Sequence, residues 1–343
     1  MHKTPLLPAL SLAGLFACPS WSLEEGDWVV ETVCELPGGT GGVEVDQQGN
    51  VYVADFSSKL GTGGTGGHRL YRIDPKGQVE LIVTSLRGGS GNAIGPDGAF
   101  YQSNIGGNSI SRISLAKKPN VETFLTRGLR SPVGIAIDDD GFLFVANCGA
   151  GSIALVSPAA EVEVFCQSPL LSCPNGIALD LDHNLYVANF NNGDVIKIDW
   201  EGKASRLATL PGNNNGHLIY HKDALYVVAR GAHQIYKVSL TGKIELFAGT
   251  GKRGSADGPT NEASFSYPND IGVTADGKSF YVNHNASVTA PHTELAPMLV
   301  RRIRLIGPSK NKSEKELQPE KQAPPKQEQA KNQQGLCFGD VEN

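Results

Sequence analysis

One pattern occurs six times along this chain, and it restricts the possible folds more than any other feature of the sequence. Each copy has an alternating apolar stretch, a turn rich in Asp and Gly, and a second apolar stretch that ends in a polar residue. The copies are GGVEVDQQGNVYVAD (41–55), SGNAIGPDGAFYQSN (90–104), VGIAIDDDGFLFVAN (133–147), NGIALDLDHNLYVAN (175–189), NGHLIYHKDALYVVAR (215–230) and NDIGVTADGKSFYVNHN (269–285). A repeat of this length built from short strands is typical of a β-propeller blade.

Two further strand-like runs follow each copy, for example Ile153–Val156 and Val162–Phe165 after the third. Four short strands form one antiparallel sheet, which cannot bury both of its faces alone. Packing six such sheets around an axis buries those faces and leaves few open edges. The sequence therefore predicts an all-β, six-bladed β-propeller with four antiparallel strands per blade.

The two ends of the repeat region indicate how the ring closes. The sixth unit supplies strand-like runs at Asp270–Thr274, Ser279–Asn283 and Leu299–Leu305, but no fourth run follows. An unassigned run, Trp28–Leu36, precedes the first copy. We therefore predict that this N-terminal strand completes the last blade.

The segments that flank the propeller differ from it in composition. Residues 1–22 have a short basic start, an apolar middle and small residues near the end, which predicts a secretory signal peptide. Cys18 also lies in a sequence similar to a bacterial lipoprotein box, so secretion, a periplasmic location and lipidation all remain open. The propeller is expected to span residues 23–308, followed by a disordered Lys/Gln/Pro-rich tail at 309–343. No other segment is long and apolar enough for a transmembrane span.

Charge and cysteine content limit the partners. The net charge is −5 and the basic residues are scattered, so a nucleic-acid partner is not expected, and we expect a monomer. An exported chain permits disulfides, and Cys166 and Cys173 are the nearest candidates for a pair. Cys148 falls on the same face and can compete for either partner. Cys34 and Cys337 form a further possible pair.

The propeller geometry predicts where a site would lie. The first residue of each copy and the residue just after its second strand should converge at one mouth of the central channel. The first ring consists of Gly41, Ser90, Val133, Asn175, Asn215 and Asn269. The second ring consists of Asp55, Asn104, Asn147, Asn189, Arg230 and His284. Most of these residues are polar, and a polar concave mouth is the expected position of a binding site.

Four of the residues near this mouth are candidates for a cation site. The amide oxygens of Asn175, Asn215 and Asn269 can converge on a hard cation such as Ca²⁺. Glu44 stands where the other copies have Ala, Leu or Gly, and it can supply the negative charge that a cation requires. Turn capping by the asparagines explains their recurrence about equally well.

Two second-ring residues depart from the repeat and are the catalytic candidates. Arg230 can hold a carboxylate or phosphate in a bidentate manner, which would suit an anionic substrate. His284 can act as a general base or orient a water molecule. The alternative for both is a packed polar side chain. His68 and His233 occupy equivalent positions in their repeats, so a structural role is expected for both.

The repeats resemble known propeller families. AGTGKRGSADGPTNEASFSYPNDIGVTADGKSFYVN (248–283) resembles an NHL repeat, and PNGIALDLDHNLYVAN (174–189) resembles the senescence-marker/gluconolactonase/strictosidine-synthase-like propellers. The second resemblance implies a Ca²⁺-dependent lactonase or phosphotriesterase activity. It implies that Asn175 is a metal ligand, that Asn215 stands where the family often has Asp, and that His284 lines the mouth.

The chain also departs from this family pattern at two positions. Gly41 stands where the family has Glu, and Ser90 stands where it has Asn, although Asn92 follows two residues later. Three functions therefore remain open. The first is a metal-dependent hydrolase of lactones or esters, with a small-molecule substrate. The second is a non-catalytic NHL-type propeller that binds a ligand or a protein through its mouth, loops or tail. The third is a lyase of the peptidyl-amidating type, with His217 and His284 as metal ligands.

Overall fold

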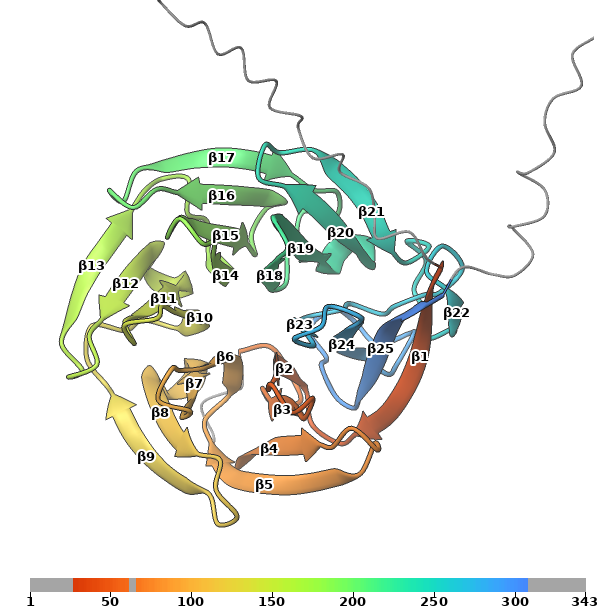
Figure 1. Cartoon of the computed structure of the whole chain (residues 1–343), viewed down its shortest axis with the longest axis horizontal. Coiled ribbons are helices and arrows are strands. Elements are labelled where there is room, and N and C mark those ends of the chain that lie inside the picture. The colour runs from red at the N-terminus through yellow and green to blue at the C-terminus, as the bar shows by residue number, and fades with distance from the viewer. Residues whose placement is uncertain (1–26, 62–65, 308–343) are drawn as a thin grey trace, which may run out of the picture. The chain divides into compact units, whose positions relative to one another are not determined.

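The computed structural model describes residues 27–61 and 66–307 of the chain. The predicted signal peptide, Cys18, Cys337 and the predicted tail lie outside these residues. The described part contains five four-stranded sheets and one five-stranded sheet, arranged around a central axis (Figure 1). The predicted six-bladed β-propeller is therefore confirmed. Within these ranges, no helix has the length and apolar character that a membrane crossing requires.

Five blades are built from four consecutive strands each, with the first strand nearest the axis. Blade 1 contains β2 (Thr40–Val45), β3 (Val51–Asp55), β4 (His68–Ile73) and β5 (Val79–Leu86). Blade 2 contains β6 (Gly89–Ile94), β7 (Phe100–Asn104), β8 (Ser109–Ser114) and β9 (Asn120–Leu125). Blade 3 contains β10 (Pro132–Ile137), β11 (Leu143–Asn147), β12 (Ser152–Val156) and β13 (Val162–Gln167).

The next two blades repeat this arrangement. Blade 4 contains β14 (Pro174–Leu179), β15 (Leu185–Asn189), β16 (Asp194–Ile198) and β17 (Ala204–Thr209). Blade 5 contains β18 (Leu218–His221), β19 (Ala224–Ala229), β20 (Gln234–Ser239) and β21 (Ile244–Ala248). Short 3-10 turns follow three of the second strands, at η2 (Ile105–Gly107), η3 (Cys148–Ala150) and η4 (Arg230–Ala232).

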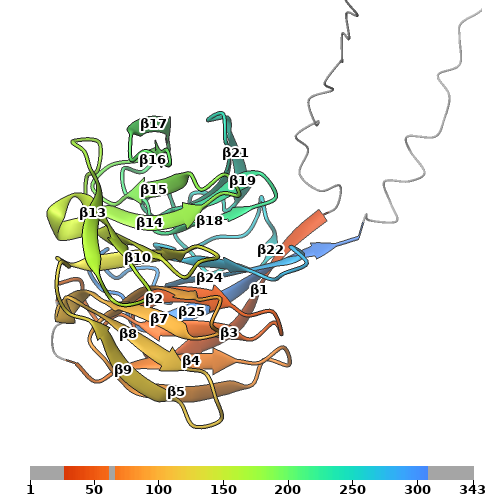
Figure 2. The ribbon, with the colours of Figure 1, turned by 60° about the vertical axis from the view of Figure 1, so that its left-hand side comes forward.

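The sixth blade joins the two ends of the described chain. Its strand order is β22 (Gly258–Pro259), β1 (Asp27–Leu36), β25 (Met298–Ile306), β24 (Ser279–Asn285) and β23 (Ile271–Val273). β1 pairs antiparallel with β25, and the two strands lie side by side in Figure 2. The predicted closure of the ring by the N-terminal strand is thus confirmed.

Aspartate side chains shape the hairpins inside the blades. In the first hairpin, Asp46 Oδ1 accepts hydrogen bonds from the backbone N–H groups of Gln48 and Asn50. Asp74, Asp138, Asp180 and Asp199 make the same pair of contacts in their own hairpins. A carboxylate that bonds its own turn in this way stabilises the tight connection between two strands.

The hydrophobic core is divided among the interfaces between neighbouring blades. At the closing blade, the Trp28 ring centroid lies 5.3 Å from that of Phe247 and 5.5 Å from that of Phe280. These rings belong to a buried cluster that joins blades 5 and 6. Aromatic rings at such separations add to the free energy gained from area burial alone. The core therefore fixes the blades around the axis without filling the axis itself.

One predicted disulfide is wrong. Cys148, at the start of η3, pairs with Cys173, which immediately precedes β14. Cys166 is buried within β13, where it stands opposite Ile153 of β12, and it has no disulfide partner. The strand register turns Cys166 into the core between blades 3 and 4. Cys148 and Cys173, by contrast, both lie in the connections at one face of the propeller.

Candidate functional site

Most residues of the second ring hold the propeller together. Asn104, Asn147 and Asn189 each accept a hydrogen bond, through Oδ1, from a backbone N–H 17 positions earlier in the chain. Asp55 accepts a similar hydrogen bond from the N–H of Gly39, 16 positions earlier. Each contact ties the segment that enters a blade to the end of its second strand. The structure therefore gives these four side chains a capping role.

His284 occupies the corresponding position of blade 6 and is fully buried. Arg301 Nη1 lies 3.0 Å from His284 Nε2, and His284 Nδ1 lies 2.8 Å from the carbonyl oxygen of Asn285. Ser266 N also donates to His284 Nδ1 at 3.2 Å, which repeats the capping contact of the other second-ring residues. Burial and the neighbouring Arg301 lower the pKa of His284 to about 3. Both ring nitrogens are therefore engaged inside the protein, away from the channel.

Arg230 is likewise buried and contacts backbone carbonyl groups. Its Nη1 donates to Tyr267 O at 2.7 Å, and its Nη2 donates to His292 O at 2.9 Å. Burial lowers the pKa of Arg230 to about 10, which leaves the side chain charged at neutral pH. The structure brings neither Arg230 nor His284 into the axial cavity described below.

The asparagines of the first ring connect adjacent blades. Asn175 Nδ2 donates to the carbonyl oxygen of Asn215, and Asn269 Nδ2 makes the equivalent contact with Gly41 O, both at 3.1 Å. The amide of Asn215 instead donates to Asp194 O at 3.2 Å, and its Oδ1 is buried without a hydrogen-bond partner. Asn175 and Asn215 thus lie together, and the amide nitrogens of all three asparagines bond backbone carbonyl groups.

These residues do not fit a calcium site. Asp270 is the carboxylate adjacent to Asn269, but its two oxygens already accept hydrogen bonds from Val43 N and Ile271 N. Glu44 lies three residues along β2 from Gly41, which is about 10 Å at the usual rise of a strand. Within the described ranges, no group of three or more His, Cys, Asp or Glu side chains is placed to hold a metal ion.

A cavity of about 930 Å³ runs along the axis of the propeller. Its wall consists of the inner strands of all six blades, from the third residue of most copies to the hairpin turns between the first and second strands. The first-ring residues do not line it. The sequence predicted a site at the mouth formed by the first-ring residues. The cavity lies instead beyond that ring, toward the hairpin turns.

Glycines allow the inner strands to approach each other around this axis. The second residue of each copy is glycine in five blades: Gly42, Gly91, Gly134, Gly176 and Gly216. A Cβ atom on Gly134 would lie 2.3 Å from Asn175 O, and one on Gly216 would lie 2.1 Å from Asn269 O. A side chain at this position would therefore collide with the next blade. The sixth blade carries Asp270 instead.

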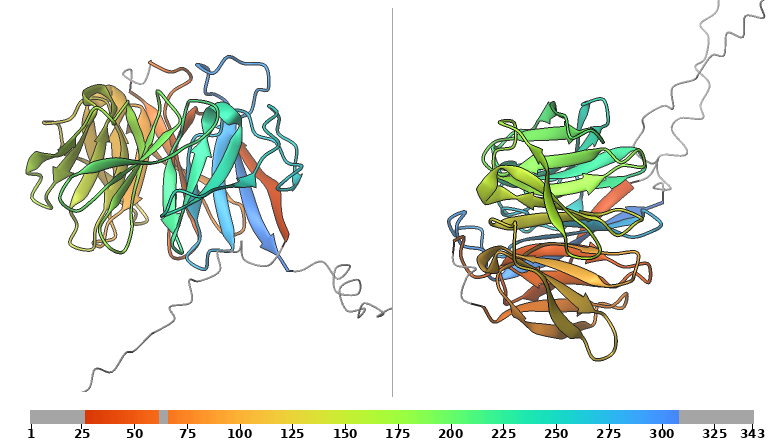
Figure 3. Two further views of the ribbon diagram at one scale, coloured as in Figure 1. Left: turned by 90° about the horizontal axis from the view of Figure 1, so that it is seen from above. Right: turned by 90° about the vertical axis from the view of Figure 1, so that its left-hand side faces the viewer.

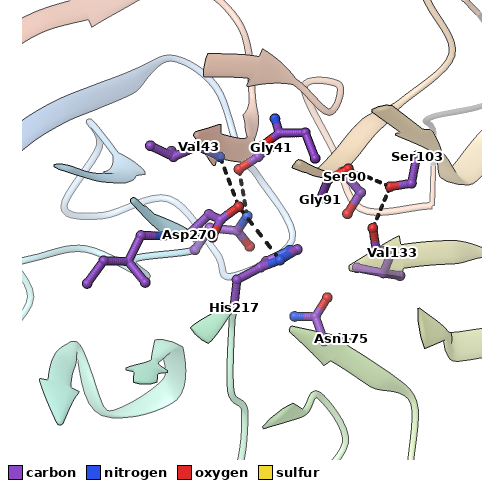
Figure 4. A network of polar contacts seen from close by, with 12 residues as sticks. Gly41, Val43, Ser90, Gly91, Ser103, Val133, Asn175, His217 and Asp270 are labelled. Carbon is purple, nitrogen blue, oxygen red and sulfur yellow. Dashed lines mark hydrogen bonds and ion pairs between the residues drawn. The ribbon is translucent and has the colours of Figure 1, made fainter. Parts of the chain in front are cut away.

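Asp270 is the polar residue that the sequence reasoning missed. Its Oδ2 accepts a hydrogen bond from Val43 N at 2.9 Å and lies 3.6 Å from Nδ1 of His217. Figure 4 shows the two side chains pointing toward each other at the channel wall. Burial raises the pKa of Asp270 well above its ordinary value. Its departure from the glycine pattern is the signal that identifies it in the sequence.

The third residue of each copy supplies two further polar groups. Four blades carry Val or Ile there, whereas blade 2 carries Asn92 and blade 5 carries His217. Burial lowers the pKa of His217 to about 4, so its ring is neutral at neutral pH. Asn92 is buried at 8% exposure, and its Oδ1 has no hydrogen-bond partner. Such an oxygen can accept a hydrogen bond from a molecule in the cavity.

Glu44, at the fourth position, also lines the cavity. Although the side chain keeps partial access to the cavity, the surrounding protein raises its pKa to about 7. The rim of the cavity adds Asp46, Asp138 and Asp139, while Arg72 is its basic residue. The cavity is therefore predominantly acidic, with a carboxyl group that changes charge near neutral pH.

Comparison with known proteins agrees with this architecture. Residues 39–174 match the family described as SMP-30/Gluconolactonase/LRE-like region. No curated protein has significant similarity to the chain.

Three solved structures illustrate the range of similar folds. Virginiamycin B lyase from Staphylococcus aureus has a TM-score of 0.55 at 16% identity, with 82% of this chain and 100% of that chain covered. A gluconolactonase from Xanthomonas campestris has a TM-score of 0.59 at 12% identity, with 80% and 89% covered. An auxiliary nutrient binding protein from Bacteroides ovatus has a TM-score of 0.62 at 14% identity, with 81% and 77% covered. At these identities the likeness establishes the fold alone.

Proposed function

We propose that this protein binds a small polar molecule in its axial cavity. The chain is a six-bladed β-propeller, and its residues 39–174 match the SMP-30/gluconolactonase/LRE-like family. One observation carries the proposal. Asn92, His217 and Asp270 line the cavity from three different blades, at positions where other blades have aliphatic residues or glycine. Closure of the ring does not require polar residues at these three positions.

The lining indicates the chemistry of the ligand. At neutral pH, His217 offers one donor and one acceptor nitrogen, and Asn92 offers an unpaired acceptor oxygen. Glu44, with a pKa of about 7, can either donate or accept. These groups suit hydroxyl groups, while the rim carboxylates disfavour an anion. The proposed ligand is therefore a neutral, hydroxyl-rich molecule such as a sugar or a sugar lactone, and not the anionic substrate suggested by Arg230 alone.

The size of the cavity and the similar structures support this proposal. A volume of about 930 Å³ lies within the range of small-molecule sites. The similar folds include a gluconolactonase and a nutrient binding protein, both named for small molecules. The proposal is thus a binding propeller of the non-catalytic kind, with hydrolysis as a second candidate.

The binding proposal can be tested by calorimetry with the whole chain. We expect heats of binding for members of a panel of monosaccharides and aldonolactones, and weaker or absent binding for the matching aldonic acids. His217→Gln should weaken binding about tenfold or more, because it removes a hydrogen bond made in a buried site. Ile177→Val, at the same position of blade 4, is the matched control and should bind as the wild type does. Equal affinity in His217→Gln and wild type would contradict the assignment.

The pairing of His217 with Asp270 favours hydrolysis of a lactone as the second candidate. His217 Nε2 would take a proton from a water molecule as the water oxygen bonds to the carbonyl carbon. Asp270 would stabilise the resulting imidazolium. The bond from that carbon to the ring oxygen then breaks, and the proton passes to the leaving alkoxide.

The same proteins can be used to test for hydrolysis. If the second candidate holds, acid release from gluconolactone should be lost in His217→Gln and retained in Ile177→Val. Repeating the assay with EDTA, and then with added Ca²⁺, addresses the metal-dependent form of the hydrolase. Turnover that EDTA abolishes and Ca²⁺ restores would contradict the His217 mechanism. Binding without turnover would leave the propeller as a binding module.

We also propose that the protein works outside the cytoplasm. The Cys148–Cys173 disulfide is consistent with an oxidising compartment. The predicted signal peptide at 1–22 would direct export, either as a secreted or periplasmic protein or as a lipoprotein anchored through Cys18. Mass spectrometry of the mature N-terminus distinguishes these outcomes.

A further inference from the structure

A second polar cluster lies outside the axial cavity, at the face where the first strands of the blades begin. It surrounds Tyr267, which precedes β23, and it includes Arg230 of η4 and Arg253. The segment that follows β24 (286–297) contributes His292 and projects from the same face (Figure 3, left). None of these residues lines the axial cavity.

Two guanidinium groups contact the Tyr267 ring. The Cζ atom of Arg253 lies 4.6 Å from the ring centroid, and that of Arg230 lies 5.3 Å from it. Arg253 Nη2 donates to Ala290 O at 2.6 Å, while its Nε is buried without a hydrogen-bond partner. Two positive charges thus share one aromatic ring, and Arg253 keeps an N–H group that no protein acceptor pairs.

No carboxylate balances these charges. Within the part of the chain that the structure describes, neither Arg230 nor Arg253 has an acidic group within 4.0 Å. The other fully buried arginine, Arg301, pairs with Asp257 at 2.6 Å. Because a buried charge without a counter-charge is costly, an uncompensated pair of guanidinium groups attracts an anion.

The same excess of positive charge acts on His233. Its Nδ1 accepts a hydrogen bond from Tyr267 N at 3.1 Å. Burial, together with Arg253 and Arg230, lowers the pKa of His233 to about 4. The imidazole therefore stays neutral and leaves the two guanidinium groups as the charges of the cluster.

The backbone of Tyr267 is held in an unfavourable conformation. Its φ angle is 50°, in the left-handed region that costs a non-glycine residue about 1 kcal/mol or more. Strain of this kind is often found where the chain contacts a ligand. Tyr267 and Arg253 are partly exposed and His292 is exposed, so a molecule from solvent can reach the cluster.

We propose that Arg253 and His292 bind an oxyanion group, either a carboxylate or a phosphate, beside the Tyr267 ring, and that the buried Arg230 contributes its positive charge to this site. A planar guanidinium matches either group in geometry and charge. This anion site is separate from the axial cavity, so its test does not depend on the proposed function.

The test compares anions at constant ionic strength. Sodium phosphate and sodium acetate are each titrated against sodium chloride, with thermal unfolding and calorimetry as readouts on the whole chain. We expect phosphate or acetate to raise the unfolding temperature of the wild type more than chloride does. The more effective of the two identifies the type of oxyanion.

Variants assign that effect to the cluster. Arg253→Gln should weaken binding of the effective anion about tenfold or more, and Arg253→Lys should weaken it less, because a charge remains. Arg112→Gln is the matched control, since Arg112 is partly exposed and is paired with Asp97 and Glu122. An unchanged response in Arg253→Gln, or a wild type that responds to all three salts alike, would overturn the proposal.

Discussion

The residues that depart from the repeat fall into two groups, and their surroundings separate them. Arg230 and His284 depart from the asparagine of the second ring, and both are hydrogen-bonded within the protein. Asn92, His217 and Asp270 depart from aliphatic or glycine positions, and they face the axial cavity. A departure from the repeat therefore marks an unusual environment, and only the structure shows whether that environment is a packed interior or the wall of a cavity.

Glu44 gives a pH-dependent prediction at the level of a single residue. Its pKa is raised from 4.5 to about 7, so between these values the unfolded chain has lost the proton that the folded protein keeps. The contribution of Glu44 to the free energy of unfolding is thus fully present below pH 4.5, and it is lost as the pH rises toward 7. As the pH rises from 4.5 to 7, the free energy of unfolding of Glu44→Gln should increase by about 1 kcal/mol or more relative to that of the wild type, as measured by urea unfolding.

Glu163→Gln provides the control for this measurement. Glu163 is an exposed glutamate on β13, so its substitution removes a charge without changing the cavity. A stability difference for Glu44→Gln that does not change with pH would contradict the assigned pKa.

The site was predicted from the sequence only in part. Glu44 was identified because it breaks a run of small and aliphatic residues, and it does line the cavity. Asp270 was missed because glycine at that position reflects contact with the next blade, which is a tertiary constraint. The asparagines at 175 and 269 were grouped correctly by repeat position, but sequence alone does not show that their amides bond the neighbouring blade.

At the level of strands, the sequence was a reliable guide. The alternation of the six copies, their Asp turns and the unassigned run at 28–36 predicted the blades and the closing strand, and β1 pairs with β25 as expected. These features follow from local periodicity and turn chemistry, which a sequence displays directly. The choice between Cys148 and Cys166 as partner of Cys173 depended on which way a strand residue faces, and the order of the cysteines does not reveal that.

The inner strands give a prediction about packing. Gly134→Ala would place a Cβ atom 2.3 Å from the carbonyl oxygen of Asn175, so β10 and β14 would have to separate. We expect a loss of about 1–3 kcal/mol in the free energy of unfolding, measured by chemical denaturation. Gly307→Ala is the control, because nothing lies within 4 Å of the added atom. Similar stabilities for the two variants would show that the inner strands tolerate side chains at this ring.

At the scale of the whole molecule, the Cys148–Cys173 disulfide links blade 3 to blade 4 across 25 residues. Closing a loop of this length should contribute about 3 kcal/mol to stability. The double variant Cys148→Ser/Cys173→Ser should therefore unfold at a lower temperature than the wild type, as measured by calorimetry. A reducing agent should lower the unfolding temperature of the wild type in the same way and leave that of the variant unchanged. A variant as stable as the oxidised wild type would rule out a stabilising link.

The pairing of β1 with β25 has a consequence for how the protein is made. The first described strand pairs with the last described strand, so the ring cannot shut until residues 298–306 have been made. Until residues 298–306 emerge, β1 is left with an exposed edge, which invites pairing with other chains. Premature termination or proteolytic trimming before that point would leave an open, association-prone intermediate, so the architecture itself distinguishes finished from unfinished copies.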